Sequence, residues 1–586
     1  MNCKITRDII ALAVACTISG AALAQFRLTQ PEATTARVDA QHTGWIPVDR
    51  AISSDRMNEF SLQWKTKVEN IARKGAALSG GVVAGAGLGV TLAHLGASGN
   101  RTVAIDMDNG HVFFDRAYSG GTAAPSSLKC LSASLATPTL STPLMPPVAP
   151  PLRPDGQSAT GPNTQLPYSS VIGEPGDGIS PVKPGAMFAA PGTFFARAGA
   201  TPYDGTPASE AAGIDYAEHG TGAAPAGFGG EPAPGRGNAA ARGGIGGRGD
   251  AFGAGRGAAG RGSGFGRGGS FRYALSNDGL LHGLTPNDGL DGQQPMPFLP
   301  ANSQASDLIM VNGTVYAATM NGCGNPANGI YAIKPAATLA GGTFPKVSSW
   351  MTGTANPHTP SFNIDGAMFV AVGSGTGDFS DSVVLLDPDT LDVKGKFTQA
   401  GADFVGPATI FRVDTRNIVA AQAADGRIFL LDGANLSVPL YVSTASIRTA
   451  GYQPAGLATW EDSTGTRWLL STTATSVVAH KLVMNGTSLS LGEGWTLGGL
   501  NTPLPPLVVN GVVFVLSSGD SPSAAKGLAQ LYAVEGMTGK TLWTSGKTAT
   551  GYVPRTSALW NSLGQILFAT SDSTIYAFGM NLERHL

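Results

Sequence analysis

The sequence predicts an all-β protein, an eight-bladed β-propeller. Two observations carry this prediction: a phrase that recurs at a near-constant interval, and a strand-like segment near the N-terminus that can close the ring. The phrase has five mostly apolar residues and ends at Asp106, Thr285, Lys334, Asp387, Asp432, Leu482, Glu535 and Gly579. From Thr285 onward its successive ends lie 49, 53, 45, 50, 53 and 44 residues apart. A period of roughly 40 to 50 residues, with several short strands in each unit, is the signature of a β-propeller.

The first 24 residues have the pattern of an export signal. Lys4 and Arg7 precede an apolar run from Ile9 to Ile18, and Ala-Leu-Ala ends at Ala24. The run is too short to span a bilayer, so we expect cleavage after Ala24 and no transmembrane segment. The mature protein is therefore expected in a periplasm or outside the cell.

Four cysteines are present, and two of them lie in the signal segment. Cys16 follows Ala-Val-Ala, which resembles a lipoprotein cleavage box only weakly. Signal removal leaves Cys130 and Cys323, and the sequence leaves open whether they form a disulfide or remain two thiols. Neither belongs to a CxxC pair, so redox catalysis and a thiolate zinc site are not supported.

Residues 25–139 are predicted to form the N-terminal strand and the first blades, and residues 271–586 the remaining blades. The two parts are separated by residues 140–270, which we predict to be a disordered, low-complexity insertion. Thirteen prolines lie between Pro138 and Pro191, and 21 glycines lie between Gly220 and Ser270. Such a segment cannot bury enough apolar surface to offset the entropy of ordering it.

The insertion also carries six arginines between residues 220 and 270 against two acidic residues. Behind a signal peptide, a flexible linker or a weak contact with anionic envelope polymers fits this tract better than RNA does. The whole chain has a formal net charge of -2, which gives no electrostatic signature of nucleic-acid binding. We expect an unknown protein or envelope polymer as partner, no nucleic acid, and a monomer.

The remaining sequence divides into eight units of short hydrophobic runs. They lie near 80–116, 131–296, 303–350, 358–398, 404–443, 452–498, 502–545 and 553–580. The last unit has three evident strands, and the alternating segment Leu62–Lys67 can supply the fourth, which would close the ring. Seven blades remain the alternative if the unit 452–498 is irregular.

Hairpin dipeptides separate the runs and predict type I′ turns. These dipeptides are Asn109-Gly110, Asp278-Gly279, Asp288-Gly289, Asn312-Gly313, Asp365-Gly366, Asp425-Gly426 and Asn510-Gly511.

One unit carries a more specific pattern, with Ala533, Glu535, the turn Thr538-Gly539-Lys540 and Trp543. It resembles the repeat of the pyrroloquinoline-quinone (PQQ) type propellers. The pattern predicts that Trp543 lies flat between adjacent blades while the Thr-Gly turn forms the hairpin.

The resemblance implies one of two classes: quinone-dependent alcohol and sugar dehydrogenases, or non-catalytic propellers similar to the outer-membrane assembly lipoprotein of Gram-negative bacteria. The large dehydrogenases carry adjacent cysteines, a calcium site and a catalytic Asp. This sequence has no adjacent cysteine pair and no residues that match the other two features by motif. We therefore expect a non-catalytic binding or assembly scaffold of the cell envelope that needs no cofactor. The alternative is a PQQ- and calcium-dependent alcohol or sugar dehydrogenase with diverged site residues.

No catalytic or cofactor-binding residue can be assigned from sequence, and no metal site is predicted. The histidines lack metal-ligand spacing; they are His42, His94, His111, His219, His282, His358, His480 and His585. The glycine-rich stretch Gly85–Gly89 lacks the final glycine and the helix of a dinucleotide-binding loop, so strand glycines explain it better. No catalytic triad can be nominated.

Overall fold

The computed structural model describes residues 37–580, apart from the two long ranges 119–136 and 140–270 and several shorter ones. The shorter gaps are 48, 50, 69–77, 79–81, 86–90, 98, 286–287, 306, 325–326, 336–342, 446–451, 455, 487, 522–525 and 556. The predicted signal peptide and the predicted disordered insertion both lie outside the described residues.

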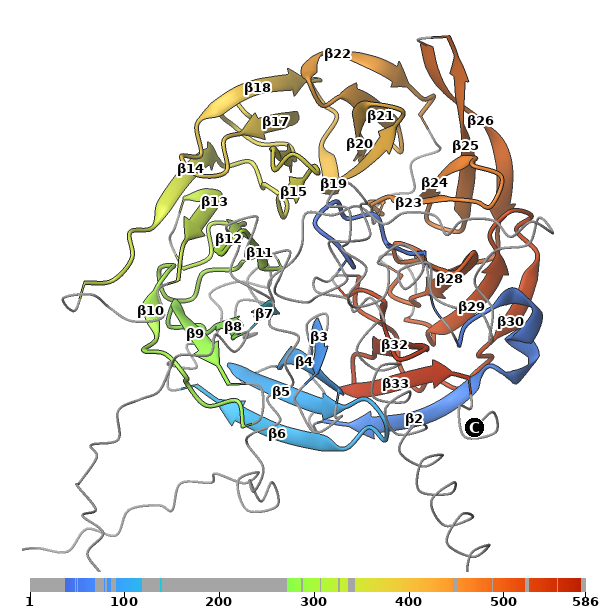
Figure 1. The fold of residues 1–586 in the computed structure, drawn as a ribbon, viewed down its shortest axis with the longest axis horizontal. Coiled ribbons are helices and arrows are strands. Elements are labelled where there is room, and N and C mark those ends of the chain that lie inside the picture. The colour runs from blue at the N-terminus through green and yellow to red at the C-terminus, as the bar shows by residue number, and fades with distance from the viewer. Residues whose placement is uncertain are drawn as a thin grey trace, which may run out of the picture.

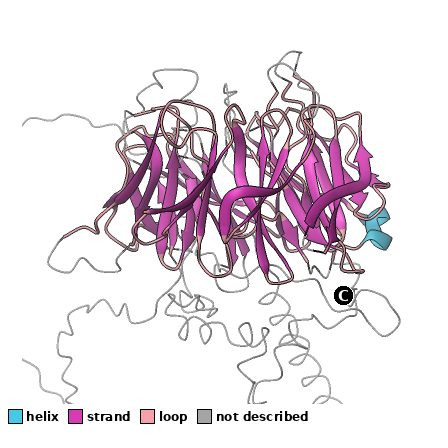
Figure 2. Cartoon of the chain, turned by 90° about the horizontal axis from the view of Figure 1, so that it is seen from above, coloured by secondary structure: helices cyan, strands magenta, loops and turns pink. Residues whose placement is uncertain are grey.

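Eight β-sheets, seven of four strands and one of five, surround a central axis (Figure 1). Their strands run between the two faces of a disc (Figure 2). Blade 1 consists of β3 (Val82–Gly85), β4 (Thr91–Ala97), β5 (Arg101–Asp106) and β6 (Val112–Ala117). Blade 2 consists of β7 (Thr137–Thr139), β8 (Arg272–Leu275), β9 (Leu280–Leu284) and β10 (Met296–Pro297). Blade 3 consists of β11 (Ile309–Val311), β12 (Thr314–Thr319), β13 (Asn328–Ile333) and β14 (Ser348–Gly353). Blade 4 consists of β15 (Ser361–Phe362), β16 (Met368–Val372), β17 (Ser382–Leu386) and β18 (Val393–Thr398).

The second half of the ring repeats this order. Blade 5 consists of β19 (Phe404–Val413), β20 (Arg416–Ala423), β21 (Ile428–Asp432) and β22 (Asn435–Val442). Blade 6 consists of β23 (Ala458–Glu461), β24 (Arg467–Thr472), β25 (Val477–Asn485) and β26 (Ser488–Leu497). Blade 7 consists of β27 (Leu507–Val509), β28 (Val512–Ser517), β29 (Gln530–Glu535) and β30 (Thr541–Thr544), with β1 (Trp45–Ile46) added beside β27. Blade 8 consists of β31 (Trp560–Ser562), β32 (Gln565–Ala569), β33 (Thr574–Gly579) and β2 (Ser61–Lys67), and a single 3-10 turn, η1 (Ser54–Glu59), precedes β2.

The predicted eight-bladed ring is thus confirmed, and the seven-bladed alternative is wrong. The unit 452–498, on which that alternative depended, forms a regular blade with the long hairpin β25–β26. The recurring phrase provides the third strand of each blade. That strand has a neighbour on both edges and a blade on both faces, so β13 and β33 are buried at every position.

The predicted closure by the N-terminal strand is also confirmed. Strand β2 pairs antiparallel with β33, with Leu62 opposite Phe578 and Trp64 opposite Ala577. The indole of Trp64 is buried and donates from Nε1 to the carbonyl of Met107 in blade 1, at 3.0 Å. Strand β2 from the N-terminal region therefore shares one sheet with the C-terminal strands β31, β32 and β33, which leaves no open edge between the first and last blades.

Aromatic side chains on outer strands pack onto glycine turns of the following blade. Trp64 lies over Gly110, where an added Cβ would come within 2.3 Å of the indole, and Trp495 lies over Gly539 in the same way, at 2.7 Å. Both glycines have positive φ, 75° and 76°, which an L residue adopts only with strain. The turn Thr538-Gly539-Lys540 of the seventh unit therefore contacts a tryptophan of blade 6, Trp495.

The prediction that Trp543 lies between adjacent blades is confirmed. Its ring packs between blade 7 and Phe578 of blade 8, and the ring planes of Phe578 and Phe60 make angles of 62° and 83° with it. Its side chain is half-buried. The reason is that η1, and not a glycine turn, lies opposite this position.

Type I′ geometry, with positive φ at both turn residues, occurs at Asn312-Gly313 and Asn510-Gly511. At the other five dipeptides only the glycine has positive φ, so the prediction is wrong there. At four of these five turns, the side chain of the first turn residue accepts the amide two residues further on, which favours a negative φ at that residue. These residues are Asn109, Asp278, Asp288 and Asp425.

The interfaces between consecutive blades, which we call seams, are mostly apolar. Within the described ranges, seven of the eight seams each hold a cluster of at least eight buried apolar side chains. The seam between blades 1 and 2 differs, because its buried apolar residues form two groups of three. These groups are Leu92, Ala104 and Phe114, and Tyr118, Ala274 and Leu284.

Candidate functional site

The N-terminal residues Arg37–Ile46, which we call the axial segment, run along the inner strands of four blades (Figure 1). Four inner-strand amides donate to carbonyls of this segment at 2.8–2.9 Å. The pairs are Phe362 to Ala40, Ile410 to Gln41, Thr459 to Thr43 and Val508 to Gly44. The segment ends as β1, which pairs in parallel with β27. The channel side of blades 4 to 7 is therefore covered by the chain's own N-terminal region.

A buried aspartate organises the bend of the axial segment. One carboxylate oxygen of Asp39 accepts the amides of Gln41 and Thr43 at 3.1 and 3.0 Å, and the other accepts the Thr43 hydroxyl. Burial raises the pKa of Asp39 to about 6, against the opposing effect of these hydrogen bonds. The Asp39 carboxylate thus accepts hydrogen bonds from nearby backbone amides, which is a structural role.

Arg37 and His42 bring basic groups to the axis. The guanidinium of Arg37 donates to the carbonyl of Leu457 in blade 6 at 3.2 Å, while its charge interacts with Asp307 beside blade 3. Burial lowers the pKa of Arg37 to about 10 and raises that of Asp307 to about 6. Burial also lowers the pKa of His42 to about 3, so this ring is neutral, and its Nε2 donates to the carbonyl of Pro360 at 3.1 Å.

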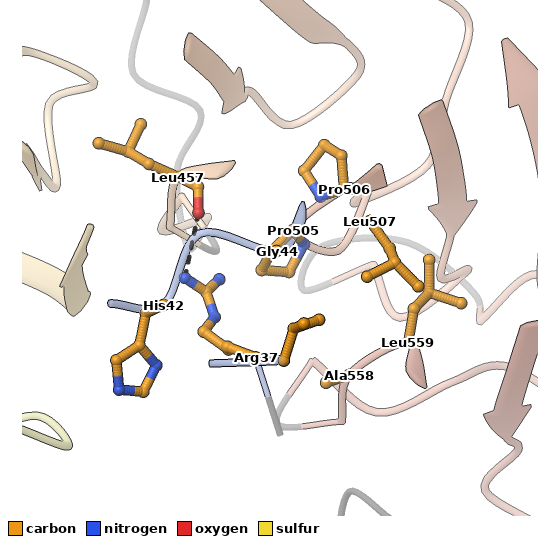
Figure 3. Close-up of a pocket in the computed structure, with 10 residues that line it drawn as sticks. Arg37, His42, Gly44, Leu457, Pro505, Pro506, Leu507, Ala558 and Leu559 are labelled. Atoms are coloured by element: carbon orange, nitrogen blue, oxygen red, sulfur yellow. Dashed lines mark hydrogen bonds between the residues drawn. The ribbon is translucent and has the colours of Figure 1, made fainter. Parts of the chain in front are cut away.

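A small cavity lies between the axial segment and blades 6 to 8. In Figure 3 the guanidinium of Arg37 is turned toward Leu457, and Leu507 and Leu559 lie on the other side. Its lining comprises Arg37, Val38, His42, Gly44, Leu457, Pro505, Pro506, Leu507, Ala558 and Leu559. The cavity volume is about 20 Å³, and a single water needs roughly 10–15 Å³. A three-ring quinone does not fit this cavity.

The seam between blades 1 and 2 contains a second polar arrangement. His282 Nε2 lies 3.0 Å from the hydroxyl oxygen of Ser276, and His282 Nδ1 lies 3.0 Å from a carboxylate oxygen of Asp291. This is the order of a serine-histidine-aspartate triad, which sequence reasoning missed because the three residues carry no motif. The hydroxyl of Ser276 also contacts the Asp278 carboxylate and lies 3.1 Å from the Leu280 carbonyl, and the residue is only 2% exposed. A nucleophile needs an accessible oxygen, so we assign these residues a structural role.

The other histidines lie in different surroundings. His94 and His358 are buried, His480 is half-buried and His111 is exposed, while His219 and His585 fall outside the described ranges. Across the part of the chain that the structure describes, no three His, Cys, Asp or Glu side chains are grouped as metal ligands would be. Gly85 ends strand β3, and the rest of its glycine-rich stretch is not described.

Of the two cysteines expected in the mature chain, Cys323 is buried and belongs to a disulfide bond. Cys130 lies outside the described residues. In the described part of the chain, no helix has the length and apolar character needed to cross a bilayer.

No protein-family model matches the sequence, and no curated protein matches it significantly. Among solved structures, the quinohemoprotein alcohol dehydrogenase from Comamonas testosteroni is 12% identical over 94% of this chain and 80% of that chain, with a TM-score of 0.49. BamB from Moraxella catarrhalis is 14% identical over 53% of this chain and 80% of its own, with a TM-score of 0.36. Sqt1 from Saccharomyces cerevisiae is 11% identical over 53% of this chain and 82% of its own, with a TM-score of 0.39. Similarities at this level assign neither a family nor a function to this chain.

Proposed function

We propose that this chain is an exported, non-catalytic PQQ-like propeller that serves as a binding or assembly scaffold in the periplasm or outside the cell. The axial segment is the observation that carries the proposal. It occupies the channel side of blades 4 to 7 and leaves a cavity of about 20 Å³ beside Arg37. A partner would then be bound by the outer surface of the ring.

The competing function is a quinone- and calcium-dependent dehydrogenase, which requires a cofactor-sized site. Purified mature protein is incubated with PQQ and calcium, desalted, and assayed for retained quinone absorbance. Reduction of an artificial electron acceptor is then measured with alcohols and aldose sugars. We expect neither retained quinone nor turnover, and substrate-dependent turnover would contradict the proposal.

The scaffold function itself is tested by photo-crosslinking in the native cell. The probe residue is placed at three exposed positions that sample different surfaces: Leu528 between β28 and β29, Leu290 between β9 and β10, and Val438 on the outer strand β22. Their exposed fractions are 50%, 59% and 69%. Leu528 and Leu290 lie on opposite faces of the disc, because successive strand connections of a blade alternate between the faces.

We expect a discrete adduct with one envelope component at one of these positions, and no such adduct at the position on the opposite face. The absence of any adduct from this panel and from neighbouring exposed positions would contradict the scaffold proposal. The enzymatic assay tests whether the protein is a dehydrogenase, and the crosslinking assay separately tests whether it binds a partner.

A further inference from the structure

The seam between blades 1 and 2 is fastened mainly by polar contacts. Arg116 of β6 donates to the carbonyl of Gly289 and to the carboxylate of Asp291, both in blade 2. The ring of Tyr118 lies 4.4 Å from that of His282. Such contacts are partly solvated and contribute less than apolar burial, because water competes for the same groups.

His94 lies in the interior of this seam and is 0% exposed. It stands on β4 opposite Ala104 of β5, and neither of its ring nitrogens has a hydrogen-bond partner among the described residues. Its face of β4 is shared with Leu92 and is directed toward blade 2, as Phe114 of the same face packs on Gly289 of that blade. A buried ring of this kind tolerates only the neutral form.

One charged group acts on His94 from across the seam, the guanidinium of Arg272 on β8. Burial first, and then this positive charge, hold the pKa of His94 well below its usual range. Strands β3 and β7 carry no titratable side chain. The remaining titratable groups on neighbouring strands are Arg101 and Asp106 on β5, Asp115 and Arg116 on β6, Tyr273 on β8, whose hydroxyl donates to Gln293, and His282 on β9.

Those remaining groups already have partners. Arg101 pairs with Asp115 at 2.7 Å, Arg116 pairs with Asp291, and His282 lies between Asp291 and Ser276. Asp106 accepts the amide of Asp108 and the side-chain amide of Asn109 in its own turn. None of the described carboxylates accepts a hydrogen bond from His94.

We propose that the seam between blades 1 and 2 is an acid-sensitive joint, at which the ring opens when His94 is protonated. A proton on His94 places a second positive charge beside Arg272 inside the protein, with no described acceptor. Among the described residues, the seam holds few apolar side chains that would keep it closed against this repulsion.

The sign of the pH effect follows from the direction of the pKa shift. The unfolded or opened chain has a histidine pKa of about 6.5, so it binds more protons than the closed seam below that pH. Stability of the seam is therefore present above about pH 6.5 and is lost as the pH falls. Asp39 and Asp307 act in the opposite sense, because their raised pKa values near 6 add stability that disappears as the pH rises. His42, His358 and His480, whose pKa values are also lowered by burial, act in the same sense as His94. They lie in the axial segment and in blades 4 and 6, so the measurement must resolve individual blades.

Hydrogen exchange of the mature protein at about pH 7.5 and about pH 5.5, corrected for intrinsic rates, tests the proposal. One pH unit below the unfolded pKa shifts the opening equilibrium by up to about tenfold. We expect protection of β4–β5 and β8–β9 to fall by about that factor, with β20–β21 and β32–β33 unchanged. The His94→Leu variant should abolish the response, and His111→Leu, at an exposed turn, should retain it.

An equal loss of protection in all blades, or an undiminished response in His94→Leu, would overturn the proposal. Should His94→Leu give no folded protein, His94→Gln takes its place, since glutamine is polar yet neutral at both pH values. A loss of protection at low pH that persists in His94→Gln would likewise overturn the proposal.

Discussion

At the scale of single residues, aromatic side chains on outer strands seal one blade to the next, and the backbone they meet decides how deeply they are buried. Trp64 and Trp495 lie over glycines with positive φ, whereas Trp543 packs against Phe60, the residue that follows η1. The sequence predicted that a tryptophan packs between two blades, but not how far its side chain is buried. The extent of burial depends on the element packed against the ring, and that element is distant in sequence.

The first prediction compares two tryptophans. Trp64→Ala should lower the free energy of unfolding by about 3–5 kcal/mol, because it removes a fully packed ring and leaves a cavity. Trp543→Ala should cost less, since its ring is half-buried. Urea denaturation of both variants gives the comparison. A larger loss for Trp543→Ala would show that the packing described for β2 is wrong.

A second prediction separates packing from backbone strain at glycine. Gly539 and Gly511 both have positive φ, but an added Cβ meets Trp495 at Gly539 and meets nothing within 4 Å at Gly511. Gly511→Ala should therefore cost only the strain of the left-handed backbone, roughly 1–2 kcal/mol. Gly539→Ala should cost about 1–3 kcal/mol more, because Trp495 must move. Equal thermal shifts in the two variants would refute the contact.

At the scale of elements, the ends of the predicted insertion are next to each other. Thr139 at the end of β7 pairs with Tyr273 in β8, so the residues on either side of the segment 140–270 belong to adjacent strands of one blade. This pairing supports an insertion into a blade, as the sequence predicted, and not a linker between two domains. The first and second strands of blade 2 are held together independently of the residues between them.

A third prediction follows for a variant that lacks residues 145–265. Its thermal transition should stay within a few degrees of the full-length mature protein, because little buried surface is lost with the segment. Differential scanning calorimetry of the two proteins measures this difference. A collapse of the melting temperature would make the segment part of the fold.

At the scale of the whole molecule, the sequence was informative wherever one pattern repeated. The phrase ending at Asp387 or Glu535 predicted the third strand, because that strand has a neighbour on each edge and in blades 3 and 8 is buried at every position. The alternation in Leu62–Lys67 predicted the closing strand for a different reason, since β2 is an outer strand on which Trp64 is buried while Lys65 and Lys67 are exposed. Periodic burial leaves a periodic trace in sequence.

The axial segment and the polar seam left no such trace. Arg37 reaches Leu457 across 420 positions of sequence, and the segment is irregular, with positive φ at Val38 and His42. His94 sits in a strand that otherwise reads as ordinary core, TLAHLGA, and only the facing blade reveals that it lies beside Arg272. Contacts of this kind depend on how blades are placed around the ring, which no local pattern encodes.

The account rests on the axial segment filling the channel side of blades 4 to 7, and hydrogen exchange at single-residue resolution tests it most directly. Four amides of the inner strands donate to carbonyls of that segment: those of Phe362, Ile410, Thr459 and Val508. In the mature protein they should exchange as slowly as the ladder amides of β20 and β28, and in a variant lacking residues 25–46 they should exchange rapidly. Rapid exchange of all four in the intact mature protein would show an uncovered channel and would contradict the proposed non-catalytic role.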